Sequence, residues 1–122
     1  MARLKIDYGI DLGTTNSAIA VMDEGKVKMY RTDTQRDTMP SCVMVTKKGF
    51  LVGDKAFAQL SKDKKKSSSD PDFVSNIFIE FKRTMGNSVK YRTDDKIGVE
   101  MSSEQLSAEV LKTLKSYVNN ES

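Results

Sequence analysis

The 122-residue sequence contains no histidine and only one cysteine, Cys42. Without imidazole it has no histidine general base, no Ser-His-Asp triad and no histidine-ligated zinc site. A single thiol cannot form an internal disulfide, which excludes a secreted scaffold held together by disulfide bonds. The chemistry of any site must therefore come from carboxylates, hydroxyls, lysines and backbone amides.

The sequence also lacks long apolar runs and a large excess of one charge. Residues 1–7 lack the apolar run of a signal peptide, and no later segment approaches the roughly eighteen apolar residues of a membrane span. Twenty basic and seventeen acidic side chains leave a net charge of +3, which argues for neither nucleic acid nor a membrane as partner. The length predicts one domain or a fragment of a larger domain. We expect the chain in a cytoplasmic, reduced compartment.

Short apolar runs at the start of the chain predict a three-stranded β-meander. The runs are residues 8–12, 18–22 and 27–30, and short polar stretches containing glycine separate them. Runs joined in this way are typical of hairpins, because parallel pairing needs a longer crossover. We therefore assign residues 1–39 to a β-meander with a polar loop at its first turn.

The rest of the chain predicts a smaller subdomain of strands and helices, residues 40–101, and a final helix, residues 102–119. Its expected elements are strands at 42–45 and 50–52, a helix capped by Asp54, a mobile lysine-rich loop at 62–70, a helix at about 74–85 closed by Gly86, and a weak strand at 96–100. Ser102 and Gln105 match a capping box at the start of the final helix. The fold class is α+β, or α/β in some schemes.

The sharpest chemical signal is the segment Ile-Asp-Leu-Gly-Thr-Thr-Asn-Ser near the amino terminus. Asp11 ends an apolar strand, where a lone carboxylate is costly unless a partner such as hydrated Mg²⁺ compensates it. Gly13 lets the backbone approach a phosphate, and the N–H groups of Thr14, Thr15 and Asn16 can point at phosphate oxygens. The segment lacks the ending of a Walker loop and the glycine spacing of a dinucleotide fold. The residues alone leave two interpretations open, a phosphate loop and a polar hairpin turn.

A resemblance decides between them. Residues 8–17 resemble the first phosphate motif of the actin, sugar-kinase and heat-shock ATPase superfamily, in the form found in DnaK-type, seventy-kilodalton heat-shock chaperones. Further segments resemble motifs of these chaperones in the same order, at 38–41, 51–56, 81–86 and 106–111. The sequence is identified as the amino-terminal part, lobe I, of such an ATPase domain in a divergent relative. The resemblance implies a fragment of the actin-like, ribonuclease H-like ATPase fold.

The resemblance also implies roles for individual residues. Asp11 corresponds to the carboxylate that holds Mg²⁺ through water, and residues 13–16 correspond to the cradle of the β- and γ-phosphates. Lys82 and Thr15 correspond to catalytic residues, Lys82 as the lysine that reaches into the cleft and orients the attacking water. From the residues alone, Lys82 could equally be a solvated lysine near the carboxyl end of a helix.

Ligands and partners follow from the same resemblance. It implies ATP or ADP with Mg²⁺ in the full-length protein, and co-chaperones or nucleotide-exchange factors as partners. The second phosphate motif, the adenosine-binding glycines and the peptide-binding domain of these chaperones have no counterpart in the sequence. We therefore expect this chain alone neither to hydrolyse ATP nor to bind it tightly.

Two other interpretations stay open. One is a stand-alone interaction or regulatory module derived from such a lobe, and the other is an unrelated small α+β binding domain. In the chaperones a parallel strand that comes after the region matching residue 122 flanks the first strand. We therefore expect an unpaired sheet edge and self-association through it.

Overall fold

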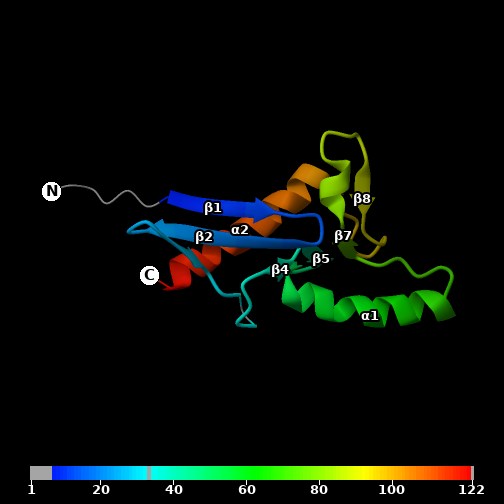
Figure 1. Cartoon of the computed structure of the whole chain (residues 1–122). Coiled ribbons are helices and arrows are strands. Elements are labelled where there is room, and N and C mark those ends of the chain that lie inside the picture. The colour runs from blue at the N-terminus through cyan, green and yellow to red at the C-terminus, as the bar shows by residue number, and fades with distance from the viewer. Residues whose placement is uncertain (1–6, 33, 122) are drawn as a thin grey trace.

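The computed structural model describes residues 7–32 and 34–121 (Figure 1). The expectations for residues 1–6 lie outside the described residues. In chain order the elements are β1 (Asp7–Leu12), β2 (Asn16–Asp23), β3 (Lys26–Met29), β4 (Met39–Pro40), β5 (Cys42–Thr46), β6 (Gly49–Val52), α1 (Asp54–Ser69), β7 (Ile77–Ile79), the 3₁₀ helix η1 (Phe81–Thr84), β8 (Lys90–Arg92), β9 (Glu100–Ser102) and α2 (Ser103–Glu121).

The first sheet is consistent with the predicted β-meander. β1 pairs antiparallel with β2 along its whole length, and β2 pairs antiparallel with β3. The turn between β2 and β3 places Glu24 and Gly25 at φ values of 50° and 79°, a feature of the primed turns that match the twist of paired strands. β4 adds a short antiparallel pairing beside the start of β2, with Asn16 opposite Pro40. This pairing brings the segment before β5 next to the first hairpin turn.

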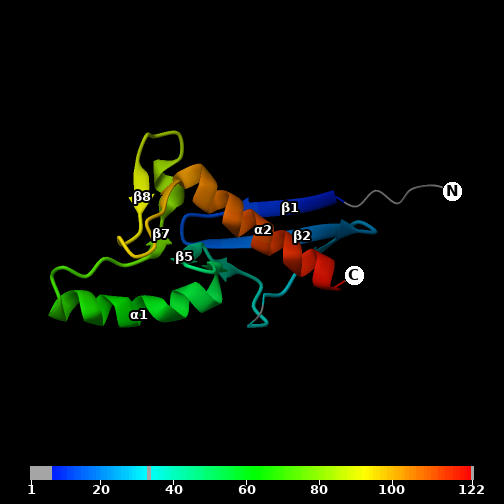
Figure 2. The ribbon, with the colours of Figure 1, turned by 180° about the vertical axis from the view of Figure 1, so that it is seen from behind.

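The second sheet has the order β6-β5-β7 and lies between two helices (Figures 1 and 2). Successive side chains of the central strand β5 point to opposite faces of the sheet, as the pleat of a strand requires. Cys42 packs with Ala56 of α1 and Ile77. Val43 and Val45 belong to the larger core, which α2 covers. One strand therefore contributes to two cores, one on each face.

Helix α2 crosses the first sheet, as Figure 2 shows, and also packs against η1. Its start confirms the predicted capping box: the N–H of Gln105 donates to the Ser102 hydroxyl (3.1 Å), and the N–H of Ser102 donates to the Gln105 side-chain carbonyl (2.8 Å). Leu106, Val110 and Leu114 follow at intervals of four residues and are buried. No helix among the described residues is long and apolar enough to cross a membrane.

The predicted lysine-rich loop at 62–70 is wrong, because α1 continues to Ser69. Lysine is a good helix former, and solvated lysines need no apolar surface to bury. The segment that follows packs back on the helix. The Lys66 ammonium lies 5.1 Å from the ring centroid of Phe73, and the Ser75 hydroxyl donates to an Asp63 carboxylate oxygen (2.6 Å). These contacts stabilise the last helical turns of α1, which composition alone assigns to a loop.

The predicted helix over 74–85 is also wrong. Residues 77–79 form β7 beside β5, and only residues 81–84 are helical, in the short 3₁₀ helix η1. Ile77 and Phe78 are both buried because β7 lies between the two cores. Glu80 has a φ of 55°, in the left-handed region, where the chain turns from strand to helix. Gly86 also has a positive φ, 83°.

Smaller differences concern element boundaries. Asp54 is the first residue of α1, and Gly53 occupies the cap position. The weak strand predicted at 96–100 lies further along, at Glu100–Ser102, where it pairs antiparallel with β8. β8 itself was not predicted, since its short polar sequence carries no alternation. The hairpin is held by tertiary contacts, with the Tyr91 ring edge-on to the Phe78 ring (centroids 5.6 Å apart).

Candidate functional site

The turn between β1 and β2 is a tight loop, residues 13–15, at the end of the first sheet (Figure 1). Gly13 does not have a positive φ, so the need for glycine there is steric rather than conformational. A Cβ atom at Gly13 would lie 2.2 Å from the backbone carbonyl oxygen of Asn16. The loop backbone therefore folds back on itself more closely than any side chain at this position would permit.

Ser41, which comes from another segment, binds this loop through two of its backbone carbonyls. Ser41, between β4 and β5, is only 3% exposed. Its N–H donates to the Thr15 carbonyl (2.8 Å), and its hydroxyl donates to the Gly13 carbonyl (2.8 Å). The Ser17 hydroxyl lies 2.7 Å from the Ser41 hydroxyl. The sequence pointed to Ser41 only as part of a resembling segment and gave it no role.

The groups predicted to bind phosphate and Mg²⁺ are not engaged by the protein. Thr14 is half-buried, whereas Thr15, Asn16 and Asp11 are exposed. Within residues 7–32 and 34–121, neither the N–H groups nor the hydroxyls of Thr14 and Thr15 have a hydrogen-bond partner, and the Asp11 carboxylate has no hydrogen-bond or ion-pair partner. These donors and this carboxylate are therefore available to a ligand. Because they come from one hairpin, the structure brings them together.

Lys82 lies on η1, in the first helical turn after β7, and its side chain is exposed. In the part of the chain that the structure describes, its ammonium group has no ion-pair or hydrogen-bond partner. No hydrogen bond or ion pair joins Lys82 to the loop at 13–15 among the described residues. The two are connected through the core, because Phe81 is buried in the cluster against which Leu12 packs.

Helix η1 is fixed by a group of hydroxyls. The Thr84 hydroxyl donates to the Phe81 carbonyl (2.9 Å) and lies 2.9 Å from the Tyr91 hydroxyl. It also contacts the hydroxyl of Ser103, the buried first residue of α2. The backbone that carries Lys82 is therefore tied to both β8 and α2.

The other reactive groups among the described residues form no further cluster. Burial raises the pKa of the Cys42 thiol to about 12, so it stays protonated at neutral pH and is a poor nucleophile. No cluster of three or more cysteine or carboxylate side chains able to hold a metal occurs within the described ranges. The Asp11 carboxylate is exposed and has no protein partner among the described residues, which suits Mg²⁺ bound through its waters.

Taken together, the β-meander, the glycine-dependent loop and its unengaged donors form a hairpin whose turn has donors open to a ligand. Comparisons with known proteins show the family to which the chain belongs. The family described as "Hsp70 protein" matches residues 7–122. The chain therefore belongs to the Hsp70 family, which implies the actin-like ATPase fold. The mixed sheets and helices described above are consistent with that fold.

Individual relatives agree with this assignment. Chaperone protein DnaK of Ureaplasma urealyticum is 36% identical over 113 residues, which cover 93% of this chain and 16% of the relative. Chaperone protein DnaK of Mycoplasmoides gallisepticum is 34% identical over 110 residues, 89% of this chain and 17% of the relative. Chaperone protein DnaK of Mycoplasma mycoides is 34% identical over 117 residues, which cover 96% of this chain and 17% of the relative. The chain thus spans 16–17% of the length of these relatives, and the predicted resemblance to the amino-terminal part of a DnaK-type ATPase domain is confirmed.

Proposed function

We propose that this chain binds the phosphates of ATP or ADP together with Mg²⁺, as the first phosphate loop of an Hsp70-type ATPase domain. The observation that carries the proposal is the loop at 13–15, where Gly13 permits close backbone approach and the donors of Thr14 and Thr15 have no protein partner. Charge-assisted hydrogen bonds from such donors to phosphate contribute about 1.5–3 kcal/mol each. A loop with free donors and no side chain at its closest point suits a phosphate.

The residues present also fit a Mg²⁺ ion. Asp11 would hold it through water, and the bound ion would neutralise charge on the phosphates. Thr14, Thr15 and Asn16 would cradle the β- and γ-phosphates. Lys82 and Thr15 are the proposed catalytic residues, with Lys82 supplying positive charge near the transferred phosphoryl group. We do not expect this chain alone to hydrolyse ATP.

The wider context is also a proposal. We infer an ATP-driven chaperone of the stress response as the whole protein, with co-chaperones or nucleotide-exchange factors as its partners. The division into a meander at 1–39, a smaller subdomain at 40–101 and a final helix at 102–119 stays a prediction. It is supported by the separation of the first sheet from the β6-β5-β7 sheet.

Replacing Asp11 with asparagine should weaken the Mg²⁺-dependent response of the loop about tenfold or more, because it removes the charge that holds the hydrated ion. In the ¹⁵N-labelled chain, Mg-ATP at roughly millimolar concentration should shift the amide resonances of Thr14, Thr15 and Asn16, consistent with weak binding. Asp11→Asn should lose the part of the shift that requires Mg²⁺ and keep the part that ATP causes in EDTA.

The matched control is Asp95→Asn, which removes an exposed carboxylate from the β8–β9 connection. It should titrate like the unchanged chain. Equal Mg²⁺ dependence in Asp11→Asn and the unchanged chain would contradict the role of Asp11. Loop amides that do not respond to Mg-ATP at all would contradict the proposed function.

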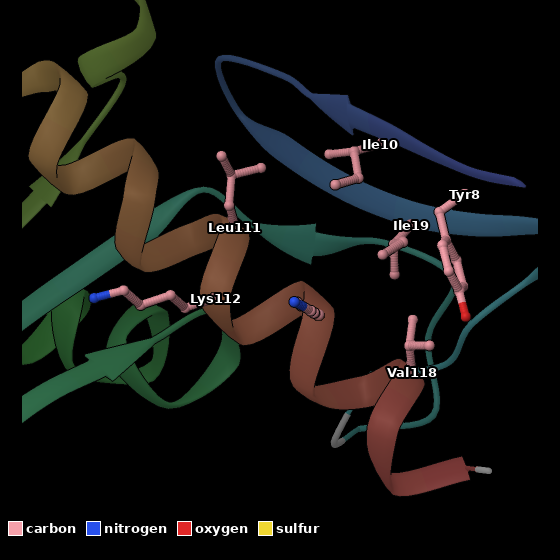
Figure 3. A pocket seen from close by; sticks show the side chains of 7 residues that line it. Tyr8, Ile10, Ile19, Leu111, Lys112 and Val118 are labelled. Carbon is pink, nitrogen blue, oxygen red and sulfur yellow. The ribbon is translucent and has the colours of Figure 1, made fainter.

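A groove beside β1 supports a second candidate function, binding of a second copy of this chain. β1 ends the first sheet and, among the described strands, pairs only with β2. Between the sheet and α2 lies a groove of about 330 Å³, in which Tyr8 and Ile10 face Leu111 and Val118 (Figure 3). Leu111 is 36% exposed at this groove. An open strand edge beside apolar side chains is a site for strand addition.

Replacing Ile10 with lysine should weaken self-association about tenfold or more, because a charge on an edge strand opposes pairing with another edge. Sedimentation velocity over a range of concentrations would measure it, with the unchanged chain sedimenting faster as concentration rises. Val27→Lys is the control, since Val27 lies on β3 of the same sheet and is 66% exposed. It should associate like the unchanged chain. A chain that remains monomeric at every concentration would exclude this candidate.

A further inference from the structure

We propose that Ser41 is the positioning residue of the phosphate loop, and that its hydroxyl sets the direction in which the loop presents its N–H groups. The inference rests on the proposed function. Its basis is the set of contacts that Ser41 makes with two successive stretches of the loop, the Gly13 carbonyl through its hydroxyl and the Thr15 carbonyl through its N–H.

These contacts determine where the donors of the loop point. In a planar trans peptide unit the carbonyl and the following N–H point in opposite directions, and no cis peptide bond occurs in the described residues. The Gly13 carbonyl points at the Ser41 hydroxyl, so the Thr14 N–H points away from Ser41. The Thr15 carbonyl points at the Ser41 N–H, so the Asn16 N–H also points away. Both carbonyls are thus held on the protein side of the loop.

The hydroxyls of Ser17 and Ser41 and the Gly13 carbonyl are linked by consecutive hydrogen bonds, each with a fixed donor. A hydroxyl has one proton to donate, and that of Ser41 goes to the Gly13 carbonyl. The Ser17 hydroxyl must therefore donate to the Ser41 oxygen, at 2.7 Å. Ser17 and Ser41 are both buried, so bulk water does not replace a lost hydroxyl. Without the Ser41 hydroxyl, the Gly13 carbonyl has no described partner and the peptide unit that carries the Thr14 N–H is free to rotate.

The inference concerns the hydroxyl and not the whole residue. The bond from the Ser41 N–H to Thr15 belongs to the pairing of β4 with β2 and survives any side chain. The bond to Gly13 requires a hydroxyl. Substitutions of the side chain therefore separate positioning of the loop from simple attachment of the β4 segment.

The test compares Ser41→Ala, Ser41→Thr and Ser17→Ala in the ¹⁵N-labelled chain, with magnesium tripolyphosphate as the probe because it carries phosphates without adenosine. The changes of the loop amide resonances during titration give the affinity for the probe. Spectra recorded without the probe show whether the substitution changes the conformation of the loop. Ser41→Ala should change the unliganded resonances of residues 13–16 and bind the probe about fivefold or more weakly. Ser41→Thr keeps a hydroxyl and should bind within about twofold of the unchanged chain.

Ser17→Ala is the matched control. It removes the same atom from the same buried cluster but leaves the bond from Ser41 to Gly13, so it should bind like the unchanged chain. A purely structural role would weaken binding equally in Ser17→Ala and Ser41→Ala, and that result would overturn the inference. If Ser41→Ala does not fold, Ser41→Cys fills the site with a weak donor and gives the same comparison.

The remaining outcomes separate this inference from the proposed function. If the unchanged chain responds to the probe and Ser41→Ala responds with equal affinity, the positioning role is overturned and the proposed function stands. If the loop amides of the unchanged chain do not respond at all, the proposed function is overturned and the inference with it.

Discussion

Replacing Phe81 with alanine should lower the free energy of unfolding by about 3–5 kcal/mol. The Phe81 side chain is 1% exposed and is among the largest fully buried side chains. It packs in the core that includes Met39, Val43 and Leu106, which come from three different segments of the chain. A typical domain has only about 5–15 kcal/mol of stability, so this single cavity would remove a large share of it.

Urea denaturation followed by circular dichroism would measure the loss. Phe57→Ala is the matched control, because Phe57 lies on α1 and is 52% exposed; it should change the unfolding free energy by about 0.5 kcal/mol or less. A loss below about 1 kcal/mol for Phe81→Ala would contradict its place in the core. Since Lys82 follows Phe81 directly, faster amide exchange in residues 81–84 should accompany the loss of stability.

Replacing Gly13 with alanine should destabilise the chain by about 1–3 kcal/mol and remove the response of the loop to phosphate. The added Cβ would collide with the Asn16 carbonyl oxygen, which belongs to the backbone and cannot rotate away as a side chain would. The hairpin must open to relieve the collision. Opening shifts the N–H groups of Thr14 and Thr15, so both the unfolding midpoint and the titration with magnesium tripolyphosphate should report the change.

Gly9→Ala provides a control on the same strand. No atom lies within 4 Å of a Cβ built at Gly9, and its φ is not positive. At such a position, replacement of glycine by alanine is expected to be neutral or to stabilise by about 0.4–1 kcal/mol, because the unfolded chain loses freedom. If Gly13→Ala behaved like Gly9→Ala, the close approach at the loop would be refuted.

Local patterns predicted some elements well. The meander follows from apolar runs separated by glycine-containing turns, and the capping box of Ser102 and Gln105 is contained within four residues. The helix over 62–69 and the strand over 77–79 were missed because tertiary contacts decide them. A short apolar run such as Ile77–Ile79 cannot be told from a helical segment by its periodicity, and only its position between two cores makes it a strand.

In the candidate site, too, local sequence predicts some features and tertiary contacts determine the others. Asp11, Gly13, Thr14 and Thr15 lie within five residues, so their grouping could be predicted from the motif. The contact of Ser41 with Gly13 joins residues that are 28 positions apart, and no local pattern announces it. The surroundings of Lys82 depend on η1, which the sequence placed in a longer helix.

Because β5 separates two cores, the smaller core beneath α1 can be probed separately through the thiol of Cys42. Among its described side chains, α1 has one buried residue, Ala56, whereas α2 buries a whole face. Segments with few buried contacts open below the global unfolding free energy, so we expect α1 to detach while the larger core stays intact. Detachment uncovers Cys42, the sole thiol in the sequence. The rate at which a thiol reagent labels the native chain therefore reads out this partial opening without an introduced probe.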